Sequence, residues 1–548
     1  MESQTRLSTD VLVIGAGGAG MYAAIEAARR GARTILADRS LIGRGGATIM
    51  AQMTVAVAVG EQVPDHWEYH YADTLAAGRG LCDHGLARLL CEEGPDVIRE
   101  MDAWGVGWAR HEGKPRGRMK QAFAPGHDRP RCVYVDFLNT GPAVSKTLRA
   151  QLNRMPDIRR VGDLLVTDLA VREGECVGAV ALHLPSGRSV TIAAAAVVVA
   201  TGGLTRLYAR NSASANMSGD GYALCLAAGA ELVDMEFVQF FPIGHLAPRL
   251  IGMDPIMWDP FRYKLGGRLL NGAREEFVHN YGASDAGKYV VTRDLATYAI
   301  VKEVEAGRGS PHGGAWLSFE HCSEAELRAA AGPVIDRLAK NGIDLMKQAI
   351  EVAPIAHYHM GGVKADISMA TRVPGLFVAG EAVGGANGAN RLSGNAITEA
   401  LVFGRKAGRS AAARARAVGG KRADERVFAN AAARLDAGRT ARDSNPAALL
   451  EELQALMQKE VGPFRTGAGL QRALTRIASM QAALPSIKPP AGKPYDTELA
   501  DWLDLSTMLV VARCVASSAL ARTESRGAHQ REDHPGLDPA WQKNQVIA

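Results

Sequence analysis

The chain has 548 residues, 47% of them hydrophobic, and a formal net charge of +5 at pH 7. This length predicts about two to four structural units, and the nearly balanced charge argues against a nucleic-acid-binding protein. The seven cysteines include no C-x-x-C pair, which predicts reduced thiols and argues against an iron–sulfur or zinc site. We see no run of about 20 apolar residues and no apolar signal core in residues 1–10, so we expect a cytoplasmic protein without a transmembrane segment.

The first predicted elements form a βαβ unit. Residues 11–14 are a short apolar, β-branched run that predicts a buried parallel strand. An alanine-rich helix is predicted over residues 21–30 and ends at Gly31, and the next strand covers residues 34–37 and closes on Asp38. This order of elements predicts the beginning of a parallel sheet.

Glycines between the first strand and helix predict a dinucleotide site. Gly15 allows a tight turn, Gly17 lets the backbone approach a pyrophosphate, and Gly20 allows close helix packing. The N-terminus of the helix would stabilise phosphate charge. Asp38 would accept hydrogen bonds from ribose hydroxyls, and it argues against a 2′-phosphate.

Later segments interrupt this sheet and then add helices. Strands are predicted at residues 196–200 and 376–379, so far from the first unit that one sheet must carry inserted segments. A proline-rich and aromatic stretch from about residue 236 to 343 predicts the inserted domain. Helical, alanine-rich sequence follows from residue 405, with helices predicted over 447–461, 470–484 and 503–522 and a linker over 485–494.

Two segments after buried strands distinguish FAD from NAD. Thr201-Gly202 follows one strand, and Gly380-Glu381 follows another. Both resemble the second and third nucleotide-contact segments of two-dinucleotide-binding flavoproteins. Asp220, in Ser218-Gly219-Asp220-Gly221, fits a further segment that contacts FAD in one branch of that class.

That branch is the succinate dehydrogenase and fumarate reductase flavoprotein family, which also holds L-aspartate oxidase and adenylylsulfate reductase. The chain resembles it over nearly its whole length, in the segments 234–240, 293–294, 354–362, 388–392 and 522–529. The resemblance implies an α/β fold: an FAD-binding, Rossmann-like domain with an inserted α+β capping domain and a C-terminal helical domain. We place the FAD-binding domain at 1–235 and 345–410, the capping domain at 236–344, and the helical domain and tail at 411–548.

The resemblance also predicts the cofactor site. The expected FAD-binding residues are Gly15, Gly17, Gly18, Gly20, Asp38, Arg39, Gly45, Gly46, Ala47, Thr48, Thr201, Gly202, Asp220, Glu381, Asn395, Ala396 and Ile397. Respiratory members bind flavin covalently through a histidine five residues before a glutamine. Counting back five residues from Gln52 gives Ala47, so we expect FAD to be bound non-covalently.

Three residues are predicted to carry the chemistry. Family members exchange a hydride between the flavin and a carbon of an organic acid, and an arginine handles the proton; its counterpart here is Arg293. His357 and Arg391 match the family's carboxylate clamp, because a planar guanidinium and an imidazole both donate to a carboxylate. We expect the nearby His359 to be structural.

The substrate pocket departs from the family pattern. Members usually read Gln-Phe-His-Pro-Thr-Gly, whereas this chain has Phe241 and Ile243 at the histidine and threonine positions. Neither side chain can hydrogen-bond a carboxylate, so we expect a substrate other than plain fumarate, succinate or aspartate. The alternative is a dicarboxylate enzyme in which His245 or Arg249 compensates.

Three other functions stay open: an oxidase of the L-aspartate type, an adenylylsulfate-reductase-like flavoprotein, and a flavin carrier without catalysis. Retained Arg293, His357 and Arg391 argue against the last. The family suggests a small organic acid as substrate and an iron–sulfur or ferredoxin-like protein as electron-transfer partner.

Overall fold

The computed structural model describes residues 5–111, 117–136, 138–250, 253, 255–281, 293–419, 425–436, 445–489 and 493–548. Two compact units are formed. The first comprises Met1–Ala209, Ala213–Val238 and Tyr358–Ala548, and the second comprises Arg210–Ser212 and Gln239–His357.

A seven-stranded mixed sheet organises the first unit. Its order is β6-β2-β1-β9-β8-β7, and β16 also pairs with β9. The strands are β1 (Thr5–Ile14), β2 (Thr34–Ala37), β6 (Ile158–Val161), β7 (Leu164–Arg172), β8 (Glu175–His183), β9 (Arg188–Val199) and β16 (Leu376–Val378). The four strands predicted at 11–14, 34–37, 196–200 and 376–379 therefore lie in one sheet and run parallel, as expected.

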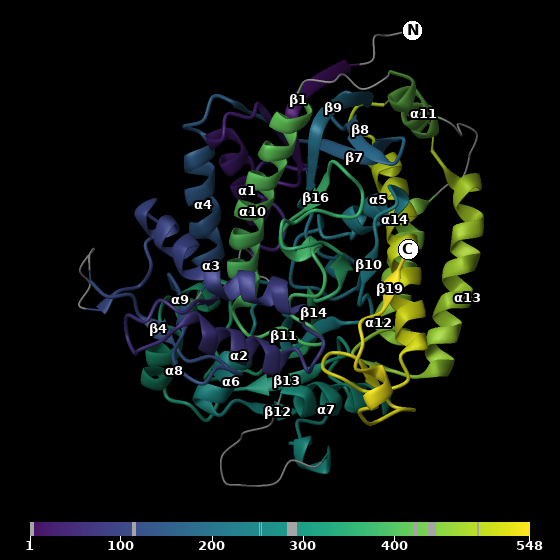
Figure 1. The fold of residues 1–548 in the computed structure, drawn as a ribbon. Coiled ribbons are helices and arrows are strands. Elements are labelled where there is room, and N and C mark those ends of the chain that lie inside the picture. The colour runs from purple at the N-terminus through teal and green to yellow at the C-terminus, as the bar shows by residue number, and fades with distance from the viewer. Residues whose placement is uncertain are drawn as a thin grey trace. The chain divides into compact units, whose positions relative to one another are not determined.

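Apolar side chains place β1 at the centre of this sheet. Residues 11–14 of β1 are almost completely buried and pair with β2 on one side and β9 on the other. Helices α1 (Gly18–Arg29) and α10 (Asn395–Val418) pack against each other and against β1 and β9 (Figure 1). The helix α1 begins three residues earlier than predicted, directly after Gly17.

Further helices of this unit are α2 (Trp67–Ala77), α3 (His84–Ala103), α4 (Thr140–Leu152) and α5 (Asp220–Ala227). Short sheets join β3 (Val55–Ala56), β5 (Cys132–Val133) and β4 (Gln121–Ala122), and join β15 (Gly362–Val363), β10 (Leu232–Val233) and β19 (Val546–Ile547). A last pair joins β17 (Phe464–Arg465) and β18 (Gln530–Arg531).

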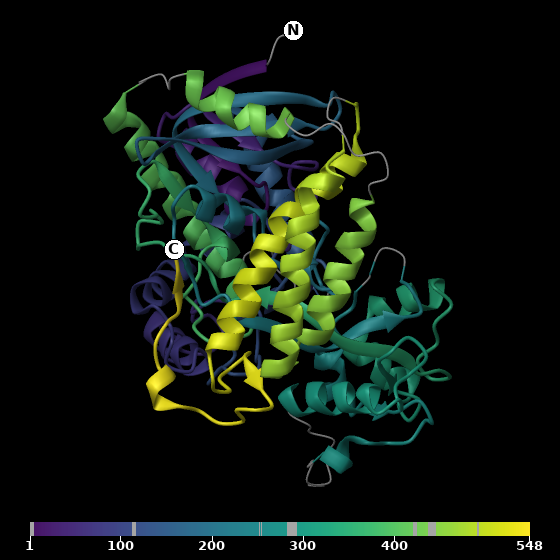
Figure 2. The same cartoon turned by 90° about the vertical axis from the view of Figure 1, so that its right-hand side faces the viewer.

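The C-terminal helices are α11 (Glu425–Asp436), α12 (Pro446–Glu460), α13 (Gly467–Ala483) and α14 (Thr497–Ala521). Helices α12, α13 and α14 pack side by side, as the green-yellow and yellow helices of Figure 2, and α14 also packs against α5. These helices belong to the same compact unit as the seven-stranded sheet.

The helix α14 is also long and apolar enough to cross a membrane by length and composition, with a mean hydropathy of 1.5. It was not predicted as a candidate span because polar residues interrupt its apolar run. Of the 18-residue stretch of α14 that has this hydropathy, 61% is buried inside the protein, which is the pattern of a core helix.

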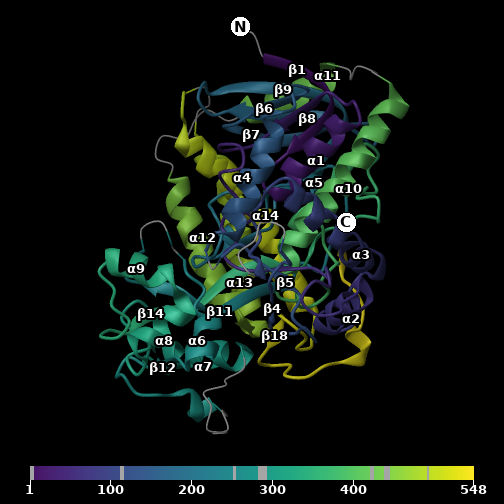
Figure 3. The ribbon, with the colours of Figure 1, turned by 90° about the vertical axis from the view of Figure 1, so that its left-hand side faces the viewer.

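The second unit is built on a four-stranded sheet of order β11-β14-β13-β12. Its strands are β11 (Val238–Ala247), β14 (Ile350–His359), β13 (Ala315–Ser318) and β12 (Arg268–Leu270). Four helices accompany them in Figure 3: α6 (Asp259–Leu265), α7 (Arg293–Glu305), α8 (Glu324–Ala331) and α9 (Pro333–Lys340). Buried Trp258 packs on Phe261 and Phe319, with ring centroids 5.7 and 6.0 Å apart, and marks the core.

All seven cysteines are free thiols, and all are buried. Within the described ranges, no three His, Cys, Asp or Glu side chains are grouped so that they could hold a metal ion.

Candidate functional site

The glycine loop after β1 has the shape of a phosphate cradle. Gly15 has φ +99°, and a Cβ there would lie 2.4 Å from the Ala200 carbonyl oxygen. A Cβ on Gly20 would lie 1.8 Å from the Gly15 carbonyl oxygen, so both positions require glycine for packing. At Gly17, by contrast, the nearest described atom to an added Cβ is Thr48 Oγ1 at 3.9 Å. Open space therefore faces the backbone at the start of α1, where a pyrophosphate would bind.

Asp38 stands at the end of β2 and is tied to this loop. Its Oδ2 accepts a hydrogen bond from the Ala16 amide at 2.6 Å, and its Oδ1 accepts from the Ser40 amide and hydroxyl at 2.8 and 2.9 Å. Burial raises the pKa of this carboxyl. The remaining lone pairs can accept hydrogen bonds from ribose hydroxyls.

The loop from Gly43 to Thr48 lies against the same helix start. Thr48 Oγ1 accepts a hydrogen bond from the Gly18 amide at 3.1 Å, and Ser214 Oγ accepts from the Gly46 amide at 2.6 Å. A Cβ on Gly45 would lie 2.4 Å from Asn216 Nδ2. The serine and asparagine contacts were not predicted, because they come from a separate loop near residue 215.

Arg39 is already engaged by the protein. Its two terminal nitrogens donate to the two carboxylate oxygens of Asp504 at 2.6 and 2.7 Å. Asp504 lies in α14, is 3% exposed, and also accepts a hydrogen bond from Arg206. Asp220 is 4.0 Å from Arg39, and burial raises the pKa of its carboxyl to about 6. Any contact of Arg39 with the cofactor thus depends on a carboxylate in the last helix.

One buried polar atom near the sheet lacks a partner. Thr201 Oγ1 has no hydrogen-bond partner in the described part of the chain. Gly202 has φ +79°, and a Cβ there would lie 2.6 Å from the Met217 sulfur. Glu381 is partly buried, its Oε1 accepts a hydrogen bond from the His359 amide at 3.1 Å, and desolvation raises its pKa to about 8.

The first turn of α10 contains Asn395, Ala396 and Ile397. The Asn395 side chain is fully used: His70 Nε2 lies 2.8 Å from its Oδ1, and its Nδ2 donates to Thr74 and Asn387 at 3.2 and 3.3 Å. Backbone amides in the first turn of a helix have no intrahelical partner. A cofactor would therefore be bound here by backbone N–H groups rather than by side chains.

These features fit a dinucleotide such as FAD. The open backbone at Gly17, the Asp38 carboxylate and the unpartnered Thr201 hydroxyl supply donors and acceptors, and two helix N-termini favour phosphate charge or a polarised ring oxygen. Position 47 carries only a methyl group, which offers no nitrogen for a covalent flavin bond.

Arg391 rests on a fixed aromatic ring in the first unit. Its guanidinium carbon is 4.5 Å from the Tyr358 ring centroid, within cation–π range. The Tyr358 hydroxyl donates to Glu399 Oε2 at 2.6 Å, and Asn387 Nδ2 donates to the same oxygen at 2.5 Å. Burial raises the pKa of the Glu399 carboxyl to about 7. Sequence reasoning missed Tyr358, Asn387 and Glu399 as supports of this arginine.

His357 is oriented within the second unit. Its Nδ1 is 2.8 Å from the Ser212 hydroxyl. Two backbone hydrogen bonds hold the Ser212 loop against β14. The Ser212 amide donates to the Ala356 carbonyl at 3.0 Å, and the Ala356 amide donates to the Arg210 carbonyl at 2.9 Å. The Phe241 ring packs edge-on against the imidazole, with centroids 5.6 Å apart. Ser212 is a further residue that sequence reasoning missed.

The other predicted pocket residues are part of the unit's core. Ile243 is 0% exposed. His245 accepts a hydrogen bond at Nδ1 from Trp258 Nε1 at 3.1 Å, and its Nε2 lies 2.5 Å from the Pro248 carbonyl oxygen. This arrangement gives His245 a structural role, which differs from the substrate contact predicted. Arg249 is exposed.

Arg293 is the first residue of α7, and its side chain and that of Asp294 lie outside the described residues. His359 has the structural role expected of it. Its Nδ1 is 3.1 Å from the Tyr222 hydroxyl and its Nε2 is 3.1 Å from the Met235 carbonyl oxygen, and burial lowers its pKa to about 4.

Comparison with known proteins gives two family matches. Residues 10–397 match the model described as FAD binding domain, and residues 450–548 match fumarate reductase flavoprotein C-term. One subunit of the fumarate reductase (CoM/CoB) of Methanothermobacter marburgensis is 33% identical over 549 residues, covering 100% of this chain and 98% of that protein. The L-aspartate oxidase of Streptomyces coelicolor is 32% identical, covering 99% and 91%. Among solved structures, an Escherichia coli quinol fumarate reductase chain matches with a TM-score of 0.89 at 31% identity, covering 99% of this chain and 94% of that one.

Proposed function

Because the chain belongs to the fumarate reductase and succinate dehydrogenase flavoprotein family, we propose that its substrate is an organic acid other than plain fumarate or succinate. It is an FAD-dependent oxidoreductase of a family whose members act on CH–CH groups. When bound, the flavin supplies the site that takes up or gives back hydride. The proposed reaction interconverts a single and a double C–C bond next to a carboxylate.

In this proposal, Arg391 and His357 bind one substrate carboxylate. The fork of a guanidinium suits a carboxylate, and the cation–π contact with Tyr358 limits where that fork can point. Ser212 holds the imidazole of His357 through Nδ1 and so fixes the orientation of the ring, which is proposed to donate to the carboxylate. Both groups would polarise the adjacent double bond.

Arg293 is proposed to transfer the proton to the neighbouring carbon. An arginine has a pKa above about 12 and is normally a poor acid. The carbon that receives the proton is carbanion-like and more basic still, so donation from guanidinium is matched in pKa. This role rests on the family resemblance of the Arg293-Asp294 segment alone.

The single observation that carries the altered substrate is Phe241, an apolar ring that packs on His357. Ile243, two residues further on, is buried in the core, and neither side chain has a group that could hydrogen-bond a second carboxylate. Burying an unpaired carboxylate costs several kcal/mol, roughly. Of the two candidates for compensation, His245 has both ring nitrogens engaged by Trp258 and the Pro248 carbonyl, whereas exposed Arg249 stays the alternative that the screen below tests.

The test is a screen of carboxylic acids against the purified holoenzyme. Monocarboxylic and bulky unsaturated acids should reoxidise the dye-reduced flavin, or saturated ones should bleach it, faster than fumarate and succinate do. The Phe241→His, Ile243→Thr double variant should gain fumarate turnover. Rapid fumarate reduction by the unaltered enzyme would refute the proposal, and peroxide release with aspartate would favour the L-aspartate oxidase alternative.

We also propose that FAD is held without a covalent bond, since residue 47 is alanine. Acid precipitation should release all flavin to the supernatant. A yellow pellet after repeated washing would contradict this.

Electrons are proposed to pass to or from a separate iron–sulfur or ferredoxin-like protein. The M. marburgensis relative is named as one subunit of its enzyme, which supports an assembly of several chains. Co-purification from the native source, followed by iron analysis, tests it; an iron-free preparation with full turnover from a natural donor would contradict it.

A further inference from the structure

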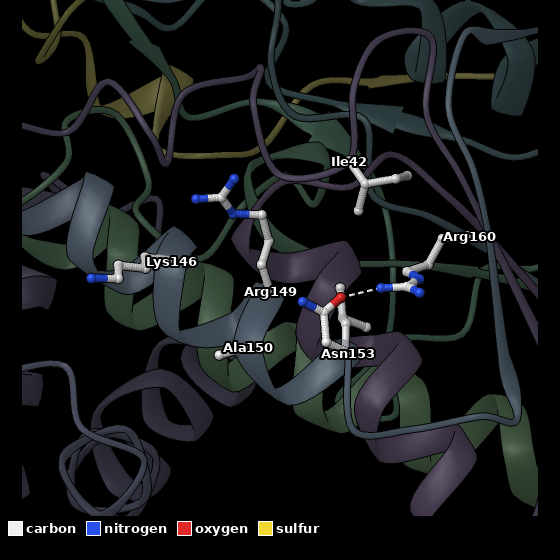
Figure 4. Close-up of a pocket in the computed structure, with 7 residues that line it drawn as sticks. Ile42, Lys146, Arg149, Ala150, Asn153 and Arg160 are labelled. Atoms are coloured by element: carbon white, nitrogen blue, oxygen red, sulfur yellow. Dashed lines mark hydrogen bonds between the residues drawn. The ribbon is translucent and has the colours of Figure 1, made fainter.

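A cavity of about 360 Å³ lies in the first unit beside α4 and β6. It is lined by Ile42, Lys146, Arg149, Ala150, Leu152, Asn153 and Arg160 (Figure 4). This volume is in the range of small-molecule sites. None of the residues proposed to bind FAD or substrate lines it.

The lining carries three cations and no carboxylate. Burial lowers the pKa of Arg149, and the nearby charge of Arg44 lowers it further. No ion pair in the described part of the chain involves Lys146, Arg149, Arg160 or Arg44. Four like charges without a counter-ion raise the local positive potential, which attracts an anion to this open, solvent-facing pocket.

The stem of Arg149 is held in place by packing, whereas Arg160 is exposed and makes one hydrogen bond. A Cβ on Gly43 would lie 2.7 Å from Arg149 Cδ, so the arginine stem packs on the loop that carries this glycine. Arg160 donates to Asn153 Oδ1, the bond drawn in Figure 4. The Nε–H of Arg149 is buried, and no described residue accepts its hydrogen bond.

We propose that this cavity binds a phosphate-bearing small organic anion about the size of a mononucleotide. The guanidinium groups of Arg149 and Arg160 offer the planar forks that suit phosphate oxygens, and Lys146 adds a point charge. Ile42, Ala150 and Leu152 provide the apolar contacts that an organic group needs and inorganic phosphate does not.

The site is separate from FAD but touches its loop. Ile42 and Gly43 follow Asp38 and Ser40 and precede Gly45 and Gly46, so a ligand held by Arg149 contacts the segment that forms the cofactor cradle. Occupancy should therefore slow FAD release, and this effect can be measured without turnover.

The experiment is calorimetric titration of the fully FAD-loaded protein with ADP, pyrophosphate and adenosine at low and at moderate salt. Full loading keeps ADP out of the adenosine end of the FAD site. ADP and pyrophosphate should bind with a Kd of about 1 mM or tighter and weaken with salt, whereas adenosine should not bind. Absence of binding by both phosphates, or equal binding of adenosine and ADP, would overturn the proposal.

Variants locate the site. Arg160 is exposed, so the Arg160→Gln variant should fold. The double variant Arg149→Gln, Arg160→Gln should weaken ADP binding by about tenfold or more, on the scale of two lost charge-assisted contacts. The matched control is Arg513→Gln, which removes one exposed cation from the middle of α14 and should leave ADP affinity unchanged. Equal ADP affinity in the double variant and the control would place binding elsewhere and refute the site. Arg160→Gln alone keeps the test decisive where the double variant fails to retain FAD.

Discussion

Replacing Glu399 with glutamine should make the protein more stable at alkaline pH. Glu399 is 0% exposed, and burial raises its pKa from 4.5 to about 7, although the Tyr358 and Asn387 donors and the charge of Arg391 oppose this rise. At about 1.36 kcal/mol per pKa unit, this rise corresponds to about 3 kcal/mol. A glutamine oxygen can still accept both hydrogen bonds, so the variant removes the charge and keeps the contacts.

The sign follows from which state holds the proton. The folded protein keeps the Glu399 proton at a pH where the unfolded chain, with a pKa near 4.5, has lost it. Its contribution to stability is therefore complete below about pH 4.5 and is lost as the pH rises through about 7. The glutamine side chain that the variant carries at this position does not titrate, so this loss is absent there.

The assay is urea unfolding with saturating FAD, followed by tryptophan fluorescence, at pH 5 and pH 8. The difference in unfolding free energy between Glu399→Gln and the unaltered protein should shift by about 3 kcal/mol in favour of the variant from the lower to the higher pH. A Tyr358→Phe variant, which deletes one donor, is the control and should lose stability at both pH values. A Glu399→Gln protein that is less stable at pH 8 than at pH 5, relative to the parent, would refute the reasoning.

Three further outcomes are expected. Gly20→Ala should lose both stability and FAD, because its Cβ would lie 1.8 Å from a carbonyl oxygen. Gly17→Ala should fold normally without FAD and lose only FAD affinity, so thermal melting of the apo-proteins should show a lower Tm for Gly20→Ala alone. Asp504→Asn removes the bidentate partner of Arg39, and breaking a buried pair in this way should lower the unfolding free energy by about 3–5 kcal/mol and raise the Kd for FAD, with an unchanged Kd counting against the link. Ser212→Ala should lower kcat/KM by about tenfold, the value of one hydrogen bond, and should displace the pH profile of kcat/KM while the flavin content stays constant. Ser212→Thr keeps a hydroxyl and should restore kcat/KM.

Local patterns were enough to predict the framework. The β-branched run at 11–14 and the alanine-rich segments produce strands and helices through burial alone, and the structure confirms that the predicted parallel strands share a sheet. One boundary differs from the prediction: α14 begins at Thr497 rather than 503, because Asp496 accepts a hydrogen bond from the Leu499 amide and caps an earlier start.

The supports of the site could not be predicted in this way. Arg39 meets Asp504 across 465 positions, and Ser212 meets His357 across 145. No sequence periodicity identifies Asp504 or Ser212 as a partner, because Asp504 is a single polar side chain in a mainly apolar helix and Ser212 lies in a loop. His245 shows the converse: its position near the expected pocket suggested a ligand, and only the contact with Trp258 reveals that its ring belongs to the core.

The pairing of Arg39 with Asp504 also bears on how the chain is made. A ribosome adds Asp504 465 residues after Arg39, and β19, which pairs with β10, is added later still. During synthesis the arginine beside the nucleotide loop therefore lacks its buried carboxylate until α14 has been made. Cofactor retention consequently requires this late segment, and a nascent chain stalled before residue 504 should fail to retain FAD.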